Sequence, residues 1–217
     1  SSLAYHGLQY IERVTGGAEA SDELPLIVAV HGLGDQPAHF AWIFDGWDYP
    51  ARIIIPAGPT PWGEGRAWMT IRTTDSQVDE LAGQTLRSAD RLAILCDELA
   101  VARPTRGKPV ITGFSQGGML AFTVAVHRPE HISGAVPVAG WLPEPLMPED
   151  KVRTAPIRAL HGEADQVLPF ARTQRSVKAL QALGADVQIK SYPGVPHSIS
   201  RDMRADLFRE IEALTSR

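Results

Sequence analysis

Apolar and polar positions follow two different periods along this chain. Short apolar runs such as 26–30 have the length and the β-branched content of buried strands. Longer segments repeat apolar residues at intervals of three and four, which is typical of helices that cover a sheet. The longest of these is 76–103, where Ser76 and Asp79 resemble a capping box and Pro104 ends the helix.

Taken in order, these patterns predict an α/β fold. Strands are expected at 5–14, 26–30, 52–56, 109–114, 132–139, 157–160 and 187–192, with helices at 76–103, 119–127, 170–183 and 200–214. The first strand is expected at an antiparallel edge, and the alternation after it indicates a mostly parallel central sheet with helices on both faces. No linker or shift in composition divides the 217 residues, so we expect a single domain over 1–217 with no large cap domain.

Composition narrows the class of protein. The formal net charge is −4 and no basic block stands out, which argues against a nucleic-acid partner. No apolar run approaches the about 18 residues that a transmembrane segment needs. The single cysteine, Cys96, excludes an intramolecular disulfide and falls on the apolar face of the helix at 76–103, as a core residue would. The compartment stays open between the cytoplasm and export after removal of a signal peptide.

The segment around Ser115 is the strongest indication of chemistry. An apolar strand delivers Gly113-Phe114-Ser115-Gln116-Gly117 directly into a helix-forming run. Gly-x-Ser-x-Gly between a strand and a helix is the pattern of a nucleophile elbow, in which the serine stands exposed on a strained turn. Backbone N–H groups of the first helical turn have no partner there, so an oxyanion beside Ser115 would be stabilised.

A serine nucleophile needs a histidine base and a carboxylate that orients it. Asp165 lies in the loop after the strand at 157–160, and His197 lies in the loop after the strand at 187–192. Because the carboxyl ends of parallel strands share one edge of the sheet, Ser115, Asp165 and His197 are expected to meet. Glu163 and Asp202 are the rivals of Asp165, which chain order and loop position favour.

Other histidines are open to simpler interpretations. His31 and His161 each end an expected strand before a glycine, where packing and hydrogen bonding beneath the site are the expected roles. His127 and His131 have the i, i+4 spacing of a metal pair, but Pro129 interrupts the helix between them. Since no third ligand clusters nearby, we expect no metal site.

A glycine loop follows the buried strand at 26–30. Acyl-transfer sites on this kind of strand–turn–helix need two convergent N–H donors, one from the residue after the nucleophile and one from such an early loop. Gln116 and Leu33 are the residues at these positions. A dinucleotide-binding loop is the alternative for Gly32-x-Gly34, but no third glycine follows at the required spacing and Pro37 intervenes.

Together these motifs resemble the α/β-hydrolases of the small carboxylesterase, lysophospholipase and acyl-protein thioesterase group, over nearly the whole chain. The resemblance is carried by His31-Gly32-Leu33-Gly34-Asp35, Gly113-Phe114-Ser115-Gln116-Gly117-Gly118, His161-Gly162-Glu163-Ala164-Asp165 with Val167 and Pro169, and Tyr192-Pro193-Gly194 leading to His197. It implies Ser115 as nucleophile, Asp165 as acid and His197 as base, with the N–H groups of Leu33 and Gln116 as the oxyanion hole.

The resemblance also implies that the loop at 56–68 walls the acyl pocket. In that group an aromatic residue and an aspartate commonly follow the tryptophan, whereas here Met69 and Thr70 follow Trp68. With little room for a cap, we expect a shallow pocket that takes short or medium acyl chains. The candidate walls are Trp42, Trp62, Trp68, Trp141, Leu142 and Leu168.

The sequence therefore predicts a serine hydrolase that cleaves carboxylic esters through a Ser115–His197–Asp165 triad and an acyl-enzyme. Its partner is a small-molecule ester or thioester, and the triad chemistry requires no metal or organic cofactor. The alternatives are lysophospholipid or thioester hydrolysis, acyl transfer to an alcohol or amine, and a non-catalytic binding role on the same scaffold. Whether the chain forms a homodimer is left open.

Overall fold

The computed structural model describes residues 7–72 and 77–216, and a seven-stranded sheet runs through this part of the chain. The strand order is β1-β3-β2-β6-β7-β8-β9. The strands are β1 (Tyr10–Val14), β2 (Leu26–Val30), β3 (Arg52–Pro56), β6 (Val110–Phe114), β7 (Gly134–Val138), β8 (Ile157–Gly162) and β9 (Val187–Tyr192). β1 is antiparallel to β3 at one edge, and the other neighbouring strands pair in parallel. The prediction of a mostly parallel sheet is confirmed.

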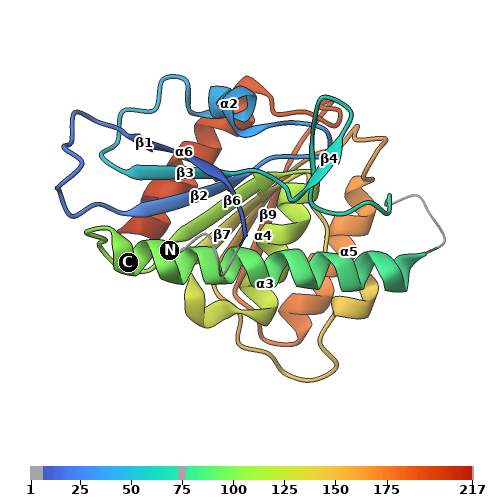
Figure 1. Cartoon of the computed structure of the whole chain (residues 1–217). Helices are drawn as coiled ribbons and strands as arrows, with labels where there is room; N and C mark the ends of the chain where they lie inside the picture. Colours follow the sequence, from blue (N-terminus) through green and yellow to red (C-terminus); the bar gives the residue numbers. More distant parts are fainter. Residues whose placement is uncertain (1–6, 73–76, 217) are drawn as a thin grey trace.

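Helices cover both faces of this sheet, as predicted (Figure 1). The α-helices are α2 (Pro37–Phe40), α3 (Val78–Ala102), α4 (Gln116–His127), α5 (Phe170–Ala182) and α6 (Arg201–Thr215). Short 3-10 turns occupy η1 (Ala41–Phe44), η2 (Pro129–His131) and η3 (Glu144–Leu146). Alternate residues of β2 enter two different core clusters, because successive side chains of a strand point to opposite faces. One cluster packs under α3, α4 and α5, and the other packs under α2, η1 and α6.

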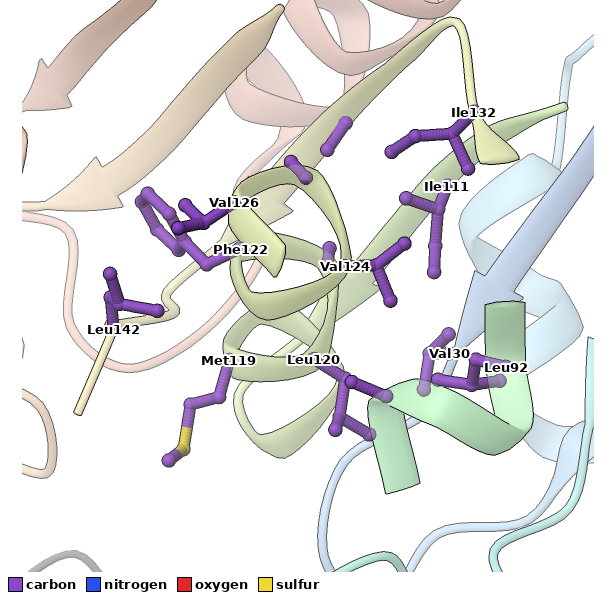
Figure 2. Packing of buried hydrophobic residues seen from close by; sticks show 14 of the residues in the cluster. Val30, Leu92, Ile111, Met119, Leu120, Phe122, Val124, Val126, Ile132 and Leu142 are labelled. Carbon is purple, nitrogen blue, oxygen red and sulfur yellow. The ribbon is translucent and has the colours of Figure 1, made fainter. Parts of the chain in front are cut away.

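The helix that follows Ser115 is the most deeply buried of the described helices. Nearly every residue of α4 is buried, and the helix packs against α3 as well as β6 and β7. Figure 2 shows Leu120 and Val124 of α4 on the side toward Val30 and Ile111 of the sheet. A helix that is apolar all round is stable only when it is covered on all sides, so α4 is a fixed support for the residue at its start.

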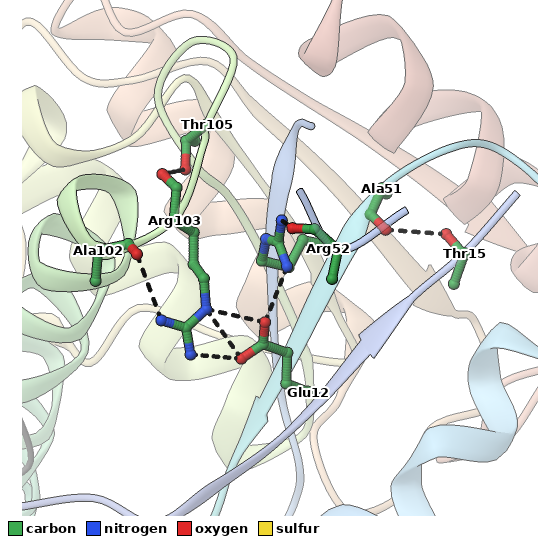
Figure 3. A network of polar contacts seen from close by, with 8 residues as sticks. Glu12, Thr15, Ala51, Arg52, Ala102, Arg103 and Thr105 are labelled. Atoms are coloured by element: carbon green, nitrogen blue, oxygen red, sulfur yellow. Dashed lines mark hydrogen bonds and ion pairs between the residues drawn. The ribbon is translucent and has the colours of Figure 1, made fainter. Parts of the chain in front are cut away.

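A partly buried polar network joins the antiparallel edge to the end of α3 (Figure 3). Glu12 of β1 accepts hydrogen bonds from the Arg52 guanidinium of β3 at 3.0 Å and from Arg103 Nη2 at 2.8 Å. These contacts, led by the hydrogen bond from Arg103, hold the pKa of Glu12 below its ordinary value of 4.5. The side chain of Arg52 is only 1% exposed, so its charge depends on this carboxylate for compensation.

Several expected boundaries differ from the structure. The strand expected at 5–14 begins at Tyr10: residues 7–9 are not strand, and 1–6 lie outside the described residues. Helix α3 begins at Val78 with no side-chain cap at Gln77, and the expected capping residue Ser76 lies outside the described residues. Helix α4 starts at Gln116, three residues before the predicted 119, and β7 is shorter than the expected 132–139.

The expected loop at 56–68 contains a small antiparallel hairpin. Its strands are β4 (Thr60–Trp62) and β5 (Gly65–Ala67). Within residues 7–72 and 77–216, no helix combines the length and the apolar composition that crossing a bilayer requires. Cys96 is fully buried in the core, where burial raises the pKa of its thiol to about 12.

Candidate active site

Ser115 occupies a sharp turn between β6 and α4. Its backbone has φ 59° and ψ −114°, a region that residues with a Cβ rarely adopt. The turn is tight enough that a Cβ on Gly117 would lie 1.9 Å from the Val30 carbonyl oxygen, and one on Gly113 would lie 2.4 Å from the Gly117 oxygen. Glycine is therefore required at both flanking positions, and the turn presents the Ser115 hydroxyl at the carboxyl edge of the sheet.

Three side chains far apart in the sequence meet at this edge. His197 Nε2 lies 2.9 Å from Ser115 Oγ, and His197 Nδ1 lies 2.7 Å from Asp165 Oδ2. An ionised carboxylate only accepts hydrogen bonds, so this pairing places the imidazole proton on Nδ1. The lone pair on Nε2 then faces the hydroxyl of Ser115, which is the arrangement that removes a proton from a serine.

Backbone groups hold the carboxylate of Asp165 in place. Its side chain is fully buried, and Oδ1 accepts hydrogen bonds from the N–H groups of Val167 at 3.0 Å and Leu168 at 2.7 Å. The second oxygen, Oδ2, lies 2.7 Å from His197 Nδ1 and 3.5 Å from His161 Nε2. Each carboxylate oxygen therefore has its own partners, so the negative charge is stabilised and its direction is set before any substrate arrives.

The loop that carries His197 lies directly on the end of β8. Ala164 N–H donates to the Val195 carbonyl at 3.0 Å, and a Cβ on Gly162 would lie 2.2 Å from that same oxygen. The ring of Phe114 packs against the imidazole of His197 with centroids 4.9 Å apart. Close backbone contact on one side and an aromatic ring on the other thus fix the position of the histidine.

Neither rival acid contacts His197. Glu163 is exposed and accepts a hydrogen bond from Ser191 Oγ at 2.8 Å. Asp202 is exposed in the first turn of α6 and lines a different cavity, together with Lys190. Of the three acids considered from the sequence, the structure brings Asp165 to the histidine.

The two expected oxyanion donors, Leu33 and Gln116, line one cavity with Ser115. Within the described part of the chain neither N–H bonds to another backbone group, since Gln116 is the first residue of α4 and Leu33 lies in a loop. The hairpin clamps this loop, because Gly34 N–H donates to the Arg66 carbonyl at 2.8 Å and Arg66 N–H donates to Asp35 at 2.9 Å.

The side chain of Gln116 plays a part that the sequence did not indicate. Its Oε1 accepts the N–H groups of Trp68 at 3.1 Å and Met69 at 3.3 Å, and its Nε2 donates to the Met69 carbonyl at 2.8 Å. Gln116 is buried, so these bonds are shielded from water. They tie the segment after the hairpin to the turn that bears Ser115.

The cavity beside Ser115 has a volume of about 330 Å³. Its lining residues are Leu33, Arg72, Ser115, Gln116, Met119, Val167 and Leu168. Of the expected walls, Leu168 is among them. A larger cavity of about 500 Å³ lies beside β1 and η1, and Trp42 lines that one.

The other expected walls lie elsewhere. Trp68 and Trp141 are each 3% exposed and Leu142 is buried, and all three pack in the core rather than along this cavity. Trp62 does not line the cavity itself. Its ring centroid lies 5.7 Å from the guanidinium carbon of Arg72, and Arg72 is one of the lining residues. Arg72, Met119 and Val167 were missed. Met119 lies one helical turn after Ser115, and Val167 is next to the expected wall Leu168, so their places in the sequence were a signal for both. No local pattern marks Arg72.

His31 and His161 are buried beneath the site, as expected, and burial lowers the pKa of each imidazole. His31 Nε2 accepts the N–H of Gly58 at 3.0 Å, and His161 Nε2 donates to the Leu168 carbonyl at 2.7 Å. Both neutral rings therefore brace loops of the site.

His127 and His131, which share the i, i+4 spacing of a metal pair, each have other partners. His127 Nε2 bonds to the Leu146 carbonyl at 2.7 Å, and His131 Nδ1 lies 2.7 Å from Asp97. Pro129 begins the 3-10 turn that separates the two histidines. His127 thus links α4 to η3, and His131 links η2 to α3.

A mostly parallel sheet with helices on both faces, and a serine at the turn from β6 into α4, defines the α/β-hydrolase fold. Within that fold, the model of the phospholipase/carboxylesterase family matches residues 14–215, and the chain belongs to this family. It is a carboxylesterase-family hydrolase. The expected resemblance is confirmed.

Named relatives agree with the family. An acyl-protein thioesterase 1 from Gibberella zeae is 27% identical over 205 residues, covering 82% of this chain and 86% of that protein. A probable carboxylesterase from Oryza sativa subsp. japonica is 29% identical over 206 residues, and the match covers 85% of this chain and 76% of that protein.

Solved structures show the same fold. The esterase PE8 superposes with a TM-score of 0.82 at 20% identity, and the match covers 95% of this chain and 99% of the PE8 chain. The Bacillus cereus carboxylesterase superposes with a TM-score of 0.77 at 16% identity, and the match covers 99% of each chain.

Proposed function

We propose that this protein cleaves carboxylic esters of short to medium acyl chains through an acyl-enzyme on Ser115. The observation that carries the proposal is the contact of His197 with both Ser115 Oγ and Asp165, at 2.9 and 2.7 Å. A hydrogen-bonded base beside a serine on a strained turn is the arrangement that nucleophilic catalysis needs.

The reaction begins with proton transfer from Ser115 Oγ to His197 Nε2 as the oxygen attacks the ester carbonyl carbon. The N–H groups of Leu33 and Gln116 stabilise the resulting oxyanion, and Asp165 stabilises the imidazolium. His197 then donates its proton to the leaving alcohol, which departs and leaves the acyl group on Ser115. Water, deprotonated by His197, attacks this acyl-enzyme and releases the acid.

The cavity supports the proposed acyl length. Its volume of about 330 Å³ is near the lower end of the ~300–1,000 Å³ range of small-molecule pockets. Met119, Val167 and Leu168 give it an apolar lining that suits an alkyl chain. A long acyl chain would have to extend beyond the cavity into water, so chain length is expected to affect kcat/KM.

A thioester is the second candidate substrate, because one relative is named an acyl-protein thioesterase. The same attack by Ser115 would release a thiol instead of an alcohol. Parallel assays with an ester and a thioester of one acyl group distinguish the two, since only the leaving group differs.

The direct test is hydrolysis of p-nitrophenyl esters of increasing acyl length by the wild type and by Ser115→Ala. We expect kcat to fall by about six orders of magnitude in the variant, with an unchanged circular dichroism spectrum. Asp165→Asn should also lower kcat severely, because it favours the wrong histidine tautomer. Asp202→Asn is the matched control and should retain activity. Retention of most activity by Ser115→Ala would overturn the proposal.

A further inference from the structure

Among the described residues that line the cavity beside Ser115, one side chain is charged. That residue is Arg72, and the others are neutral. The cavity is otherwise largely apolar, and the chain as a whole has a formal net charge of −4. A cation at the site of an otherwise acidic protein creates a local potential opposite to the charge of the whole molecule.

Contacts with Trp62 and Gln116 hold Arg72 and the residues just before it beside the cavity. Its guanidinium lies over the ring of Trp62 at 5.7 Å from the centroid, a cation–π distance. Trp62 belongs to the hairpin that clamps the Leu33 loop. Just before Arg72, the backbone at Trp68 and Met69 is tied to Gln116. The same contacts that fix the site therefore also bring the guanidinium to it.

We propose that the site selects esters that carry an anionic group, such as a carboxylate, and that Arg72 is the residue that recognises it. The inference rests on the proposed ester hydrolysis and adds a substrate class to it. A guanidinium presents several N–H donors in one plane and pairs with a carboxylate in bidentate fashion. An anionic substrate gains this contact, and a neutral substrate of the same size does not.

The overall charge makes the inference testable. A net charge of −4 disfavours anions by long-range repulsion, so a preference for an anionic ester has to come from a local cation. The pairing lies at an exposed side chain, where ion pairs are weak and screened by salt. We therefore expect a difference of about fivefold, which disappears as ionic strength rises.

The experiment compares matched esters. In the first pair, mono-p-nitrophenyl adipate carries a carboxylate on the acyl side and p-nitrophenyl hexanoate is its neutral counterpart. In the second pair, 4-acetoxybenzoate carries a carboxylate on the alcohol side and phenyl acetate is its neutral counterpart. The quantity measured is the ratio of kcat/KM for the anionic and the neutral ester in each pair. A ratio cancels any loss of active enzyme, so a variant that folds less well does not mimic the effect.

The variants are Arg72→Gln, Arg72→Lys and, as control, Arg13→Gln. Arg13 lines the separate cavity beside β1, so its replacement makes the same change in net charge away from Ser115. We expect Arg72→Gln to lower the ratio about fivefold in at least one pair at low salt. Arg72→Lys should keep part of the preference, and Arg13→Gln should leave it unchanged.

The outcomes separate this inference from the proposed function. Hydrolysis of neutral esters with the same ratio in wild type and Arg72→Gln, in both pairs, overturns the role of Arg72 alone. An equal fall of the ratio in Arg13→Gln also overturns it, because the effect would then come from net charge. Lack of hydrolysis of all four esters by the folded wild type overturns the proposed ester hydrolysis and the inference with it.

Discussion

The side chain of Gln116 is expected to stabilise the whole fold as well as the site. Gln116→Ala removes the acceptor of two N–H groups, those of Trp68 and Met69, and the donor to the Met69 carbonyl. A buried polar group left without a partner costs about 1–3 kcal/mol, and partial access of water reduces the sum. We therefore expect a loss of about 3 kcal/mol in the free energy of unfolding.

The loss can be measured by thermal and urea denaturation. For a chain of this size 1 kcal/mol corresponds to about 2–4 °C in Tm, so the expected fall is about 6–12 °C. The control is Gln84→Ala, which removes an exposed acceptor of the Thr70 N–H that water can replace, for an expected loss of under about 1 kcal/mol. If Gln116→Ala melted no lower than Gln84→Ala, the segment after the hairpin would not depend on Gln116.

Gly162, Cys96 and Glu12 each allow a further test of the structure. Gly162→Ala should lower kcat at least about tenfold, because its Cβ would lie 2.2 Å from the Val195 oxygen and displace the histidine loop, whereas Gly83→Ala, whose Cβ has space, should not. Cys96, with a pKa of about 12, should fail to react with a thiol reagent in the native protein and should react fully after denaturation in guanidinium. Glu12 has a lowered pKa in the folded protein, so its contribution to stability is present above the ordinary pKa of 4.5 and is lost as pH falls through the lowered value. Urea denaturation should therefore show a steeper loss of stability below pH 4.5 for the wild type than for Glu12→Gln.

Elements with strong periodicity were predictable from the sequence, and irregular ones were not. The strands Leu26–Val30, Arg52–Pro56 and Val187–Tyr192 lie where the pattern predicted them. The hairpin formed by β4 and β5 was missed, because strands of three residues that include proline and glycine have no measurable period. The organisation as a single domain stays a prediction.

At the site, the order and local setting of Ser115, Asp165 and His197 were sufficient to predict that they meet, because parallel strands bring their loops to one edge. Their roles in catalysis stay predictions. The residues that line the cavity were harder to predict, because an aromatic residue in a loop looks the same in the sequence whether it packs in the core or lines a cavity. Trp68 faces inward, and exposed Arg72, four residues later, reaches the cavity.

The backbone conformation that exposes the Ser115 hydroxyl for its proposed role also lowers the stability of the folded protein. A residue with a Cβ held in such a region costs about 1–3 kcal/mol, and glycine would occupy the position without that cost. The close packing of Gly113 and Gly117 keeps the turn in this form. Replacing Ser115 by glycine would therefore ease folding but remove the hydroxyl, so the proposed reactivity, and not the stability of the turn, accounts for a serine at this position.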